Sequence, residues 1–117
     1  PAGQGGQEAE ALRALVLAAG NRPVAVPAAA PGDRFTFGVR TLGLSWVELW
    51  IDGERRIYRN LDAGEAYTYE VREEVSLRFG RAENVVVALN GVEIGTLGTS
   101  VINKRFILDT AQNEPAE

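Results

Sequence analysis

Two tryptophans and a glutamate stand at alternate positions of one apolar segment, as Trp46, Glu48 and Trp50. In a β-strand alternate side chains share a face, and the intervening valine, leucine and isoleucine would fill the opposite face. A tryptophan on the polar face of a strand can stack against a sugar ring or anchor a partner protein. Alternatively, a loop or residues 8–19 cover this face, and both rings are then part of a core. The pattern predicts a contact surface for a protein partner or a glycan.

A cluster of arginines with one tyrosine follows the next turn, as Arg55, Arg56, Tyr58 and Arg59. Clustered cations can bind an anion or an acidic partner. They can also keep the edge of a sheet soluble, and the neighbouring aspartates and glutamates favour that second interpretation. We retain Tyr58 and Arg56, together with the two tryptophans, as candidate contacts for a partner or a glycan.

The acidic residues do not form a catalytic arrangement. Glu70, Glu73 and Glu74 surround Arg72 in an expected turn, whereas glycoside hydrolysis needs two carboxyl groups about 5–10 Å apart across a cleft. The spacing of a calcium-binding loop is also absent. The chain has no histidine and no cysteine, which removes the commonest general base, metal ligands and nucleophile arrangements. We therefore predict no enzymatic activity, no metal and no cofactor.

Length and charge narrow the classes of function further. A chain of 117 residues can form one domain with its own core. Its formal net charge of −4, from 12 basic and 16 acidic residues, argues against nucleic-acid binding, which needs a basic surface. No apolar run approaches the roughly 20 residues of a membrane span. The longest, residues 14–19, also lacks the flanks of a signal peptide.

Residues 1–32 are predicted to be a flexible N-terminal segment or linker. Residues 1–7 are rich in glycine and expected to be disordered, whereas alanine and leucine in residues 8–19 favour a short helix. A strand over residues 12–18 is the alternative. Residues 23–31 combine proline with alanine and valine, which favours an extended linker of polyproline II character.

Residues 33–110 carry the signature of an all-β domain, and residues 111–117 are expected to be a flexible tail. Six to eight short strands about ten residues apart predict a small antiparallel β-sandwich. The expected strands are residues 35–40, 45–51, 56–60, 66–71, 75–79, 85–89, 92–94 and 101–108. The expected turn residues are Asp52, Gly53, Gly64, Asn90, Gly91 and Gly98. Asn90-Gly91 is the strongest of these signals, because both central residues of a type I′ turn have positive φ. The alternation predicts a core of Phe35, Phe37, Val47, Leu49, Ile51, Val75, Leu77, Phe79, Val85, Val87, Leu89, Ile102, Phe106 and Leu108.

Several short motifs occur together and in a particular order. They are Ser45-Trp46-Val47-Glu48-Leu49, Asp52-Gly53, Leu61 with Gly64-Glu65, Val75–Ala82, Val85–Gly91 and Leu97-Gly98. Over residues 33–108 this order resembles the C-terminal extracytoplasmic domain of RodZ-type bacterial cell-shape proteins. The family pattern also has a tryptophan at Trp46, so Trp50 is the stronger candidate for a contact. Two features depart from the family: a corner usually written Gly-Asn-Ala reads Gly80-Arg81-Ala82, and residues 8–19 have no counterpart.

The resemblance implies that the chain is a fragment of a single-pass membrane protein. Such proteins carry a cytoplasmic helix-turn-helix domain, one transmembrane helix, a linker and this β domain outside the cytoplasmic membrane. The implied function is a non-catalytic, extracytoplasmic module that helps to position the cell-wall elongation machinery. Its implied partners are proteins of that machinery or peptidoglycan. We expect no nucleic-acid binding through this domain, and membrane contact only through a transmembrane helix that this chain does not contain.

Two other functions remain open. One is a cell-wall carbohydrate-binding module, which would show saturable quenching of tryptophan fluorescence by peptidoglycan fragments. The other is an accessory β-sandwich domain of a larger enzyme, which would require a catalytic domain elsewhere in the same gene.

Overall fold

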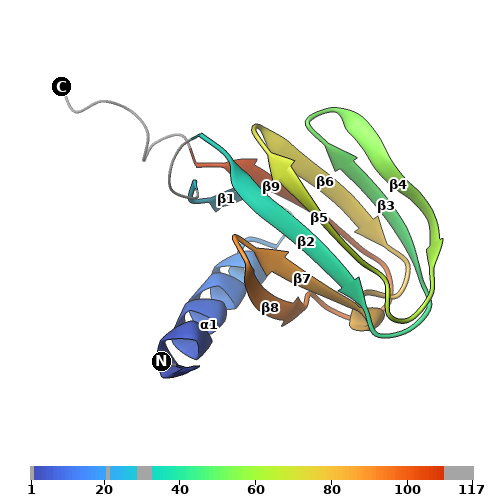
Figure 1. Ribbon diagram of the computed structural model, residues 1–117, viewed down its shortest axis with the longest axis horizontal. Helices are drawn as coiled ribbons and strands as arrows, with labels where there is room; N and C mark the ends of the chain where they lie inside the picture. The colour runs from blue at the N-terminus through green and yellow to red at the C-terminus, as the bar shows by residue number, and fades with distance from the viewer. Residues whose placement is uncertain (1, 21, 29–32, 110–117) are drawn as a thin grey trace.

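A computed structural model describes residues 2–20, 22–28 and 33–109 and shows two β-sheets packed face to face (Figure 1). The sheets have the strand orders β1-β9-β6-β3-β4 and β5-β2-β7-β8. The strands are β1 (Val24–Val26), β2 (Phe35–Thr41), β3 (Ser45–Ile51), β4 (Glu54–Leu61), β5 (Ala66–Val71), β6 (Glu74–Phe79), β7 (Val85–Leu89), β8 (Val92–Thr96) and β9 (Ile102–Leu108). All pairings are antiparallel except that of β1 with β9. The predicted all-β sandwich is confirmed, with nine strands in the described residues where six to eight were expected.

Local turn chemistry forms the β3–β4 and β7–β8 hairpins. The φ angles are 51° and 85° at Asp52-Gly53, and 54° and 82° at Asn90-Gly91. These are the positive values that a type I′ turn requires, and φ is also positive at Gly64, at 87°. At Gly98 φ is 159°, close to extended backbone. Close packing accounts for the glycine there, because an added Cβ would lie 3.2 Å from Ile102 Cγ2.

The first residue of each hairpin turn also binds a distant segment. The Asp52 carboxylate accepts hydrogen bonds from three consecutive backbone N–H groups of residues 72–74, at 2.7–3.1 Å. The Asn90 Oδ1 atom accepts a hydrogen bond from Thr36 N at 3.0 Å, and its Nδ2 donates to the carbonyl oxygen of Pro27 at 2.9 Å. Each turn therefore fastens a neighbouring loop or strand to its hairpin.

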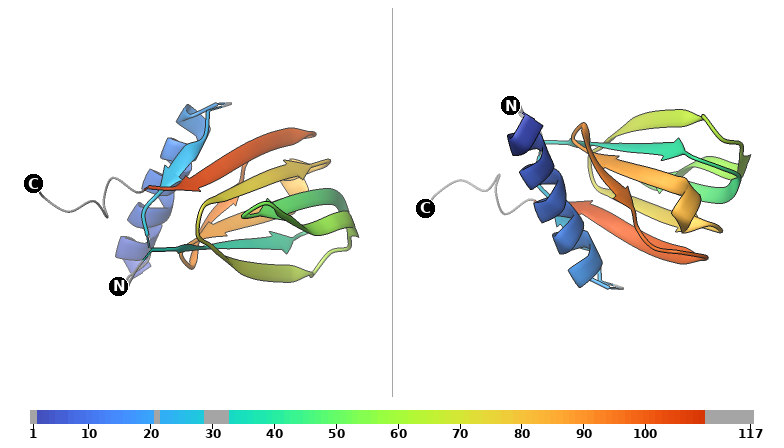
Figure 2. Two further views of the ribbon diagram at one scale, coloured as in Figure 1. Left: turned by 90° about the horizontal axis from the view of Figure 1, so that it is seen from above. Right: turned by 90° about the horizontal axis from the view of Figure 1, so that it is seen from below.

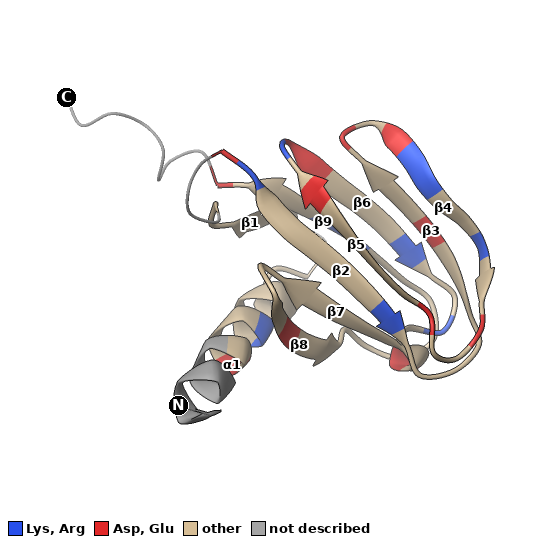
Figure 3. Cartoon of the chain, viewed as in Figure 1, with Lys and Arg blue, Asp and Glu red and all other residues tan. Residues whose placement is uncertain are grey.

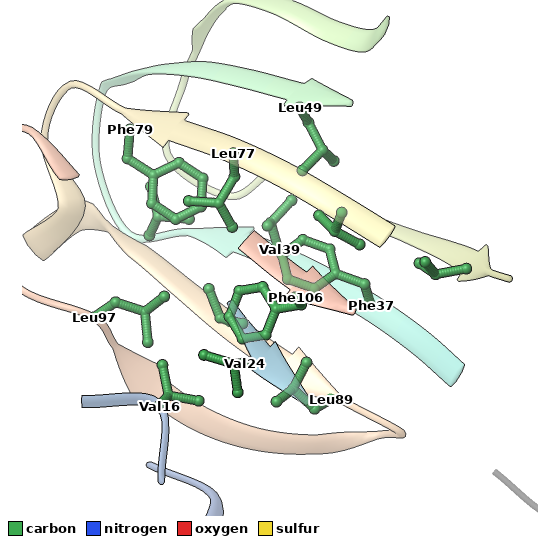
Figure 4. Close-up of a cluster of buried hydrophobic side chains, with 14 of the residues drawn as sticks. Val16, Val24, Phe37, Val39, Leu49, Leu77, Phe79, Leu89, Leu97 and Phe106 are labelled. Atoms are coloured by element: carbon green, nitrogen blue, oxygen red, sulfur yellow. The ribbon is translucent and has the colours of Figure 1, made fainter. Parts of the chain in front are cut away.

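Apolar side chains from both sheets fill the space between them (Figure 4). Phe37 on β2 and Phe106 on β9 meet across this core with ring centroids 5.4 Å apart. All predicted core residues are buried except Ile102, which is partly buried against the core. The alternation did not identify further buried residues, namely Val16, Val24, Val26, Val39, Ile57, Leu61, Val71, Ala82, Val86, Ile94 and Leu97.

β1 lies within the predicted polyproline II linker. Val24 and Val26 are only 2% and 1% exposed, and they pair with Phe106 and Leu108 of β9. The described part of this segment therefore includes an edge strand of the five-stranded sheet. Its two valines bury apolar surface that a solvated linker would leave in water. The predicted tail, residues 111–117, lies outside the described residues.

One α-helix, α1 (Ala2–Ala18), lies across one end of the sandwich (Figure 2). It begins before the predicted start at residue 8, and it includes most of the segment that was expected to be disordered. Val16 is fully buried in the core. Arg13 Nη1 donates hydrogen bonds to the carbonyl oxygens of Ile94, at 2.9 Å, and Thr96 on the edge strand β8. The helix therefore covers one edge of the four-stranded sheet.

A lysine from the other sheet holds the C-terminal end of α1. Lys104 Nζ donates hydrogen bonds to the carbonyl oxygens of Val16, at 2.8 Å, and Gly20, at 2.6 Å. A cation is favourable there because the final carbonyl groups of a helix lack partners and carry partial negative charge. Partial burial beneath the helix lowers the pKa of Lys104.

The corner after β6 packs tightly against the start of β3. Gly80 N donates a hydrogen bond to Trp46 O at 2.8 Å, and Arg81 N donates to Ser45 Oγ at 3.1 Å. A Cβ atom at Gly80 would lie 3.0 Å from Trp46 Cβ. Arg81 has φ −135° and ψ 81°. Because this φ is negative, the corner does not need an asparagine's tolerance of left-handed backbone.

Candidate functional site

The candidate contact residues lie on the outer face of the five-stranded sheet. On β3 the side chains of Trp46, Glu48 and Trp50 alternate with fully buried ones. Strand pairing extends this face into two rows of directly opposed residues. One row is Tyr58, Glu48, Arg78 and Asn103, and the next is Arg55, Trp50, Ser76 and Arg105. Opposed side chains on adjacent strands are close enough to interact.

Aromatic rings and one guanidinium group form a stacked ladder across β3 and β4. Trp46 and Tyr58 meet edge to face, with ring centroids 4.9 Å apart and an interplanar angle of 78°. The Arg55 Cζ atom lies 4.0 Å from the centroid of Tyr58 and 5.9 Å from that of Trp50. Stacked guanidinium and aromatic groups are common in protein interfaces. We call Trp46, Trp50, Arg55 and Tyr58 the aromatic ladder.

Glu48 fixes the orientation of Trp50. The indole Nε1 of Trp50 donates a hydrogen bond to Glu48 Oε2 at 3.0 Å. Trp50 nevertheless remains 38% exposed as a residue, and Tyr58 is 52% exposed. The aromatic surface is therefore both oriented by neighbours and open to solvent, which suits a preformed contact surface.

Within the described residues, neither a loop nor α1 covers the face of the sheet at Trp50, as the alternative interpretation required. α1 packs at the end of the sandwich against β8 and β9, away from the β3–β4 hairpin (Figure 1, Figure 2). Trp46 differs, because its side chain is half-buried and its Cβ packs on Gly80. Trp46 therefore serves the fold as well as the surface.

Arg55 takes the place in the ladder where the sequence favoured Arg56. A β-bulge shifts the register between Leu49 and Trp50, so that Trp50 is opposite Arg55 while Leu49 is opposite Ile57. Arg56 is the extra residue, and it forms an ion pair with Glu54 at 3.0 Å. The sequence pattern could not show this, because strict alternation places Arg56 and Tyr58 on the same face.

Arg59 belongs to a separate cluster that links β4 to β5. Its Nη2 donates hydrogen bonds to Glu65 Oε1 at 3.1 Å and to Tyr67 Oη at 2.6 Å. The carboxylate of Glu65 also accepts hydrogen bonds from the Tyr67 hydroxyl, at 2.5 Å, and from Asp62 N, at 2.8 Å. These bonds, led by that of Tyr67, lower the pKa of Glu65 to about 2. The cluster closes the Leu61–Glu65 turn and therefore has a structural role.

The acidic residues considered for catalysis pair with different arginines. Glu70 on β5 accepts a hydrogen bond from Arg34 at 2.9 Å, and Glu74 on β6 accepts one from Arg105 at 3.0 Å. Among the residues that the structure describes, no group of three or more histidine, cysteine, aspartate or glutamate side chains could hold a metal ion. Likewise, no helix in this part of the chain has the length and hydropathy of a membrane span.

The sequence pattern did not identify three further residues of the outer face as part of the site. Ser76, Arg78 and Asn103 come from β6 and β9, and strand pairing brings them beside Trp50 and Glu48. Their positions in the alternating pattern mark them as outward-facing. Only the pairing of β3 with β6 and of β6 with β9, which is not a local property of the sequence, places them in one site.

Comparison with known proteins finds one family. A family model described as the RodZ C-terminal domain matches residues 39–106, more than half of the chain. This range begins within β2 and ends within β9, so α1 and β1 lie outside it. Searches of curated proteins and of solved structures find no match.

Proposed function

The chain belongs to the RodZ C-terminal domain family, and from that premise we propose that it is a non-catalytic interaction module of a cell-shape protein. The module docks onto a protein partner of the cell-wall elongation machinery through the aromatic ladder on β3 and β4. In the intact protein it lies outside the cytoplasmic membrane, anchored by a transmembrane helix outside this chain.

This proposal rests on one observation, the exposure of the aromatic ladder to solvent. Tryptophan, tyrosine and arginine are the residue types enriched at binding hot spots. Here they contact one another on adjacent strands, at distances of 4.0–5.9 Å. Neighbouring groups already restrict these side chains. Their loss of conformational entropy when a partner binds is therefore smaller than for mobile side chains.

The basic residues of this surface favour a partner that carries an acidic group. Arg55 on β4 and Arg78 on β6 are opposite outward-facing residues of β3. Figure 3 shows basic positions on both strands, although the whole chain is acidic. The ladder arginine, Arg55, forms no ion pair with any described residue. An acidic group on the partner can therefore pair with it, which favours correct orientation during association.

The test is Trp50→Ala in the full-length protein, in cells that depend on that protein for rod shape. We expect the cells to lose rod shape. The free energy of unfolding of this domain should fall by no more than about 1.5 kcal/mol, since the ring makes one hydrogen bond and one long cation–π contact. Urea unfolding of the purified chain measures this fall.

Arg55→Ala provides a second, milder change in the same ladder, and Arg72→Ala is its matched control. Arg72 is an exposed arginine in the β5–β6 turn, and its side chain makes no contact with the ladder. We expect Arg55→Ala to impair rod shape and Arg72→Ala to leave it normal. Normal shape with Trp50→Ala, or a fall in stability above about 4 kcal/mol, typical of a truncated core aromatic, would overturn the proposal.

A further inference from the structure

A shallow hollow of about 190 Å³ lies beside Trp50, on the side of β3 away from the ladder's Tyr58. Its lining includes Glu48, Trp50, Ser76, Arg78 and Asn103. A second hollow, of about 260 Å³, continues across β6 and β9 and shares Ser76 and Asn103 with the first. The two form a polar trough with one aromatic wall, built on three adjacent strands of the five-stranded sheet, β3, β6 and β9.

Three polar side chains of this trough lack partners among the described residues. Arg78 is opposite Glu48 across the β3–β6 pair, yet the Glu48 carboxylate turns along its own strand to the indole of Trp50, at 3.0 Å. The guanidinium of Arg78, the hydroxyl of Ser76 and the amide of Asn103 make no hydrogen bond or ion pair with any described residue. Their hydrogen-bonding capacity is therefore available to a ligand.

The charge of the trough indicates an anionic ligand. Arg78 forms no ion pair with any described residue. Arg105 lines the neighbouring hollow, whereas the ammonium group of Lys104, which also lines it, is bound to carbonyl oxygens at the end of α1. Glu48 is the acid on these rows, and it binds the indole of Trp50; Glu74, at the start of β6, pairs with Arg105 at 3.0 Å, so neither acid forms an ion pair with Arg78. A ligand carboxylate beside Arg78 would form a charge-assisted hydrogen bond.

The shape and polarity of the trough indicate a saccharide. It offers no deep apolar pocket for a hydrophobic side chain, but it has one exposed indole and several planar polar groups. Sugar rings present an apolar face that stacks on tryptophan and hydroxyl groups that bind amide, hydroxyl and guanidinium groups. We propose that this trough binds an acidic saccharide, with Trp50 against a sugar ring, Arg78 on a ring-borne carboxylate, and Ser76 and Asn103 on hydroxyl groups.

This site goes beyond the proposed protein interface and does not depend on it. The two share Trp50, but Ser76, Arg78 and Asn103 lie on β6 and β9, whereas Tyr58 and Arg55 lie on β4. A substitution at Arg78 therefore tests the saccharide without removing a residue of the aromatic ladder.

The experiment titrates the 117-residue chain, labelled with ¹⁵N, with three probes. They are the disaccharide N-acetylglucosaminyl-N-acetylmuramic acid, trigalacturonic acid and the neutral disaccharide chitobiose. We expect saturable shifts of the Trp50 indole and Asn103 side-chain signals with an acidic probe, and binding at least about tenfold weaker with chitobiose, because one charge-assisted hydrogen bond is lost. The preferred acidic probe distinguishes a muramic acid glycan from a polyuronic acid.

Arg78→Gln is the diagnostic variant, and Arg72→Gln is its matched control. We expect Arg78→Gln to weaken binding of the acidic probe at least about tenfold and to remove its dependence on salt, whereas Arg72→Gln should change neither. Equal binding of chitobiose and the acidic probes would overturn the proposal, as would no binding at millimolar concentrations. Preferential binding of a hexaglutamate peptide would also overturn it and would assign the trough to an acidic polypeptide.

Discussion

Asn90 provides a sharp test of what a hairpin turn residue does in this fold. Asn90→Gly retains the ability to adopt φ of 54° and removes the side chain alone. If asparagine served only to turn the chain, glycine would change the free energy of unfolding by no more than about 1 kcal/mol, since its easier positive φ and its greater freedom in the unfolded chain oppose each other. The two side-chain hydrogen bonds, to Thr36 N and Pro27 O, predict a larger loss.

The magnitude follows from those two bonds. Each hydrogen bond contributes about 0.5–1.5 kcal/mol to stability, and more when the remaining partner stays buried. Replacing asparagine with glycine removes only a small backbone strain. It also favours the unfolded state by roughly 0.5–1 kcal/mol, because glycine gives the unfolded chain more conformational freedom. We therefore expect Asn90→Gly to lower the free energy of unfolding by about 1–3 kcal/mol.

Urea unfolding followed by tryptophan fluorescence measures this change, and hydrogen exchange of the Thr36 amide locates it. Asn90→Ala is the control, because it loses the same two bonds and also places a Cβ at positive φ, which costs roughly 1 kcal/mol more. The expected order of stability is Asn90, then Gly, then Ala. Equal or greater stability of the Gly variant would refute the assignment of a clamping role to this side chain.

Three further predictions concern other contacts. Because the pKa of Glu65 falls from 4.5 to about 2 on folding, its contribution to stability is complete above pH 4.5 and declines as the pH falls through 2; acid unfolding of Glu65→Gln should lack this component. Gly80→Ala should lower the free energy of unfolding by about 1–3 kcal/mol, because its Cβ would lie 3.0 Å from Trp46 Cβ. A thermal or urea unfolding curve unchanged by it would contradict this packing. Lys104→Met should speed amide exchange in the last turn of α1 at least about tenfold, because the hydrogen bonds to the carbonyl oxygens of Val16 in α1 and of Gly20 just after it are lost.

The strands and turns of the sandwich could be predicted because their signals are local. Alternation of apolar residues defined β2, β3, β6 and β7 almost to their observed bounds, and positive φ at Asp52-Gly53 and Asn90-Gly91 follows from residue type alone. These features depend on residues a few positions apart, which a single sequence displays directly.

The N-terminal region could not be predicted, because its structure depends on distant partners. β1 has only three residues, and its two valines are buried by pairing in parallel with β9, about 80 positions away. α1 begins with a glycine-rich segment of low helix propensity. Arg13 and Lys104 hold its later turns against two different strands. No pattern within residues 1–32 indicates either contact.

The candidate site shows the same division between local and distant information. Trp46, Glu48 and Trp50 could be placed on one face from their spacing. Ser76, Arg78 and Asn103 could not be joined to them, because register between strands decides which residues are opposed. The sequence therefore predicted the aromatic part of the surface and not its polar part.

The bulge in β4 explains why the site has its particular composition. In an unbroken ladder, Arg56 would oppose Trp50, since Ile57 opposes Leu49. The extra residue shifts the pairing by one, so that Arg55 reaches both Tyr58 and Trp50 while Arg56 pairs with Glu54. A bulge changes the direction of a side chain and bends its strand locally. One guanidinium is thereby placed between two aromatic rings, and it is this displacement, rather than the number of arginines, that makes the outer face of β3 and β4 a structured surface.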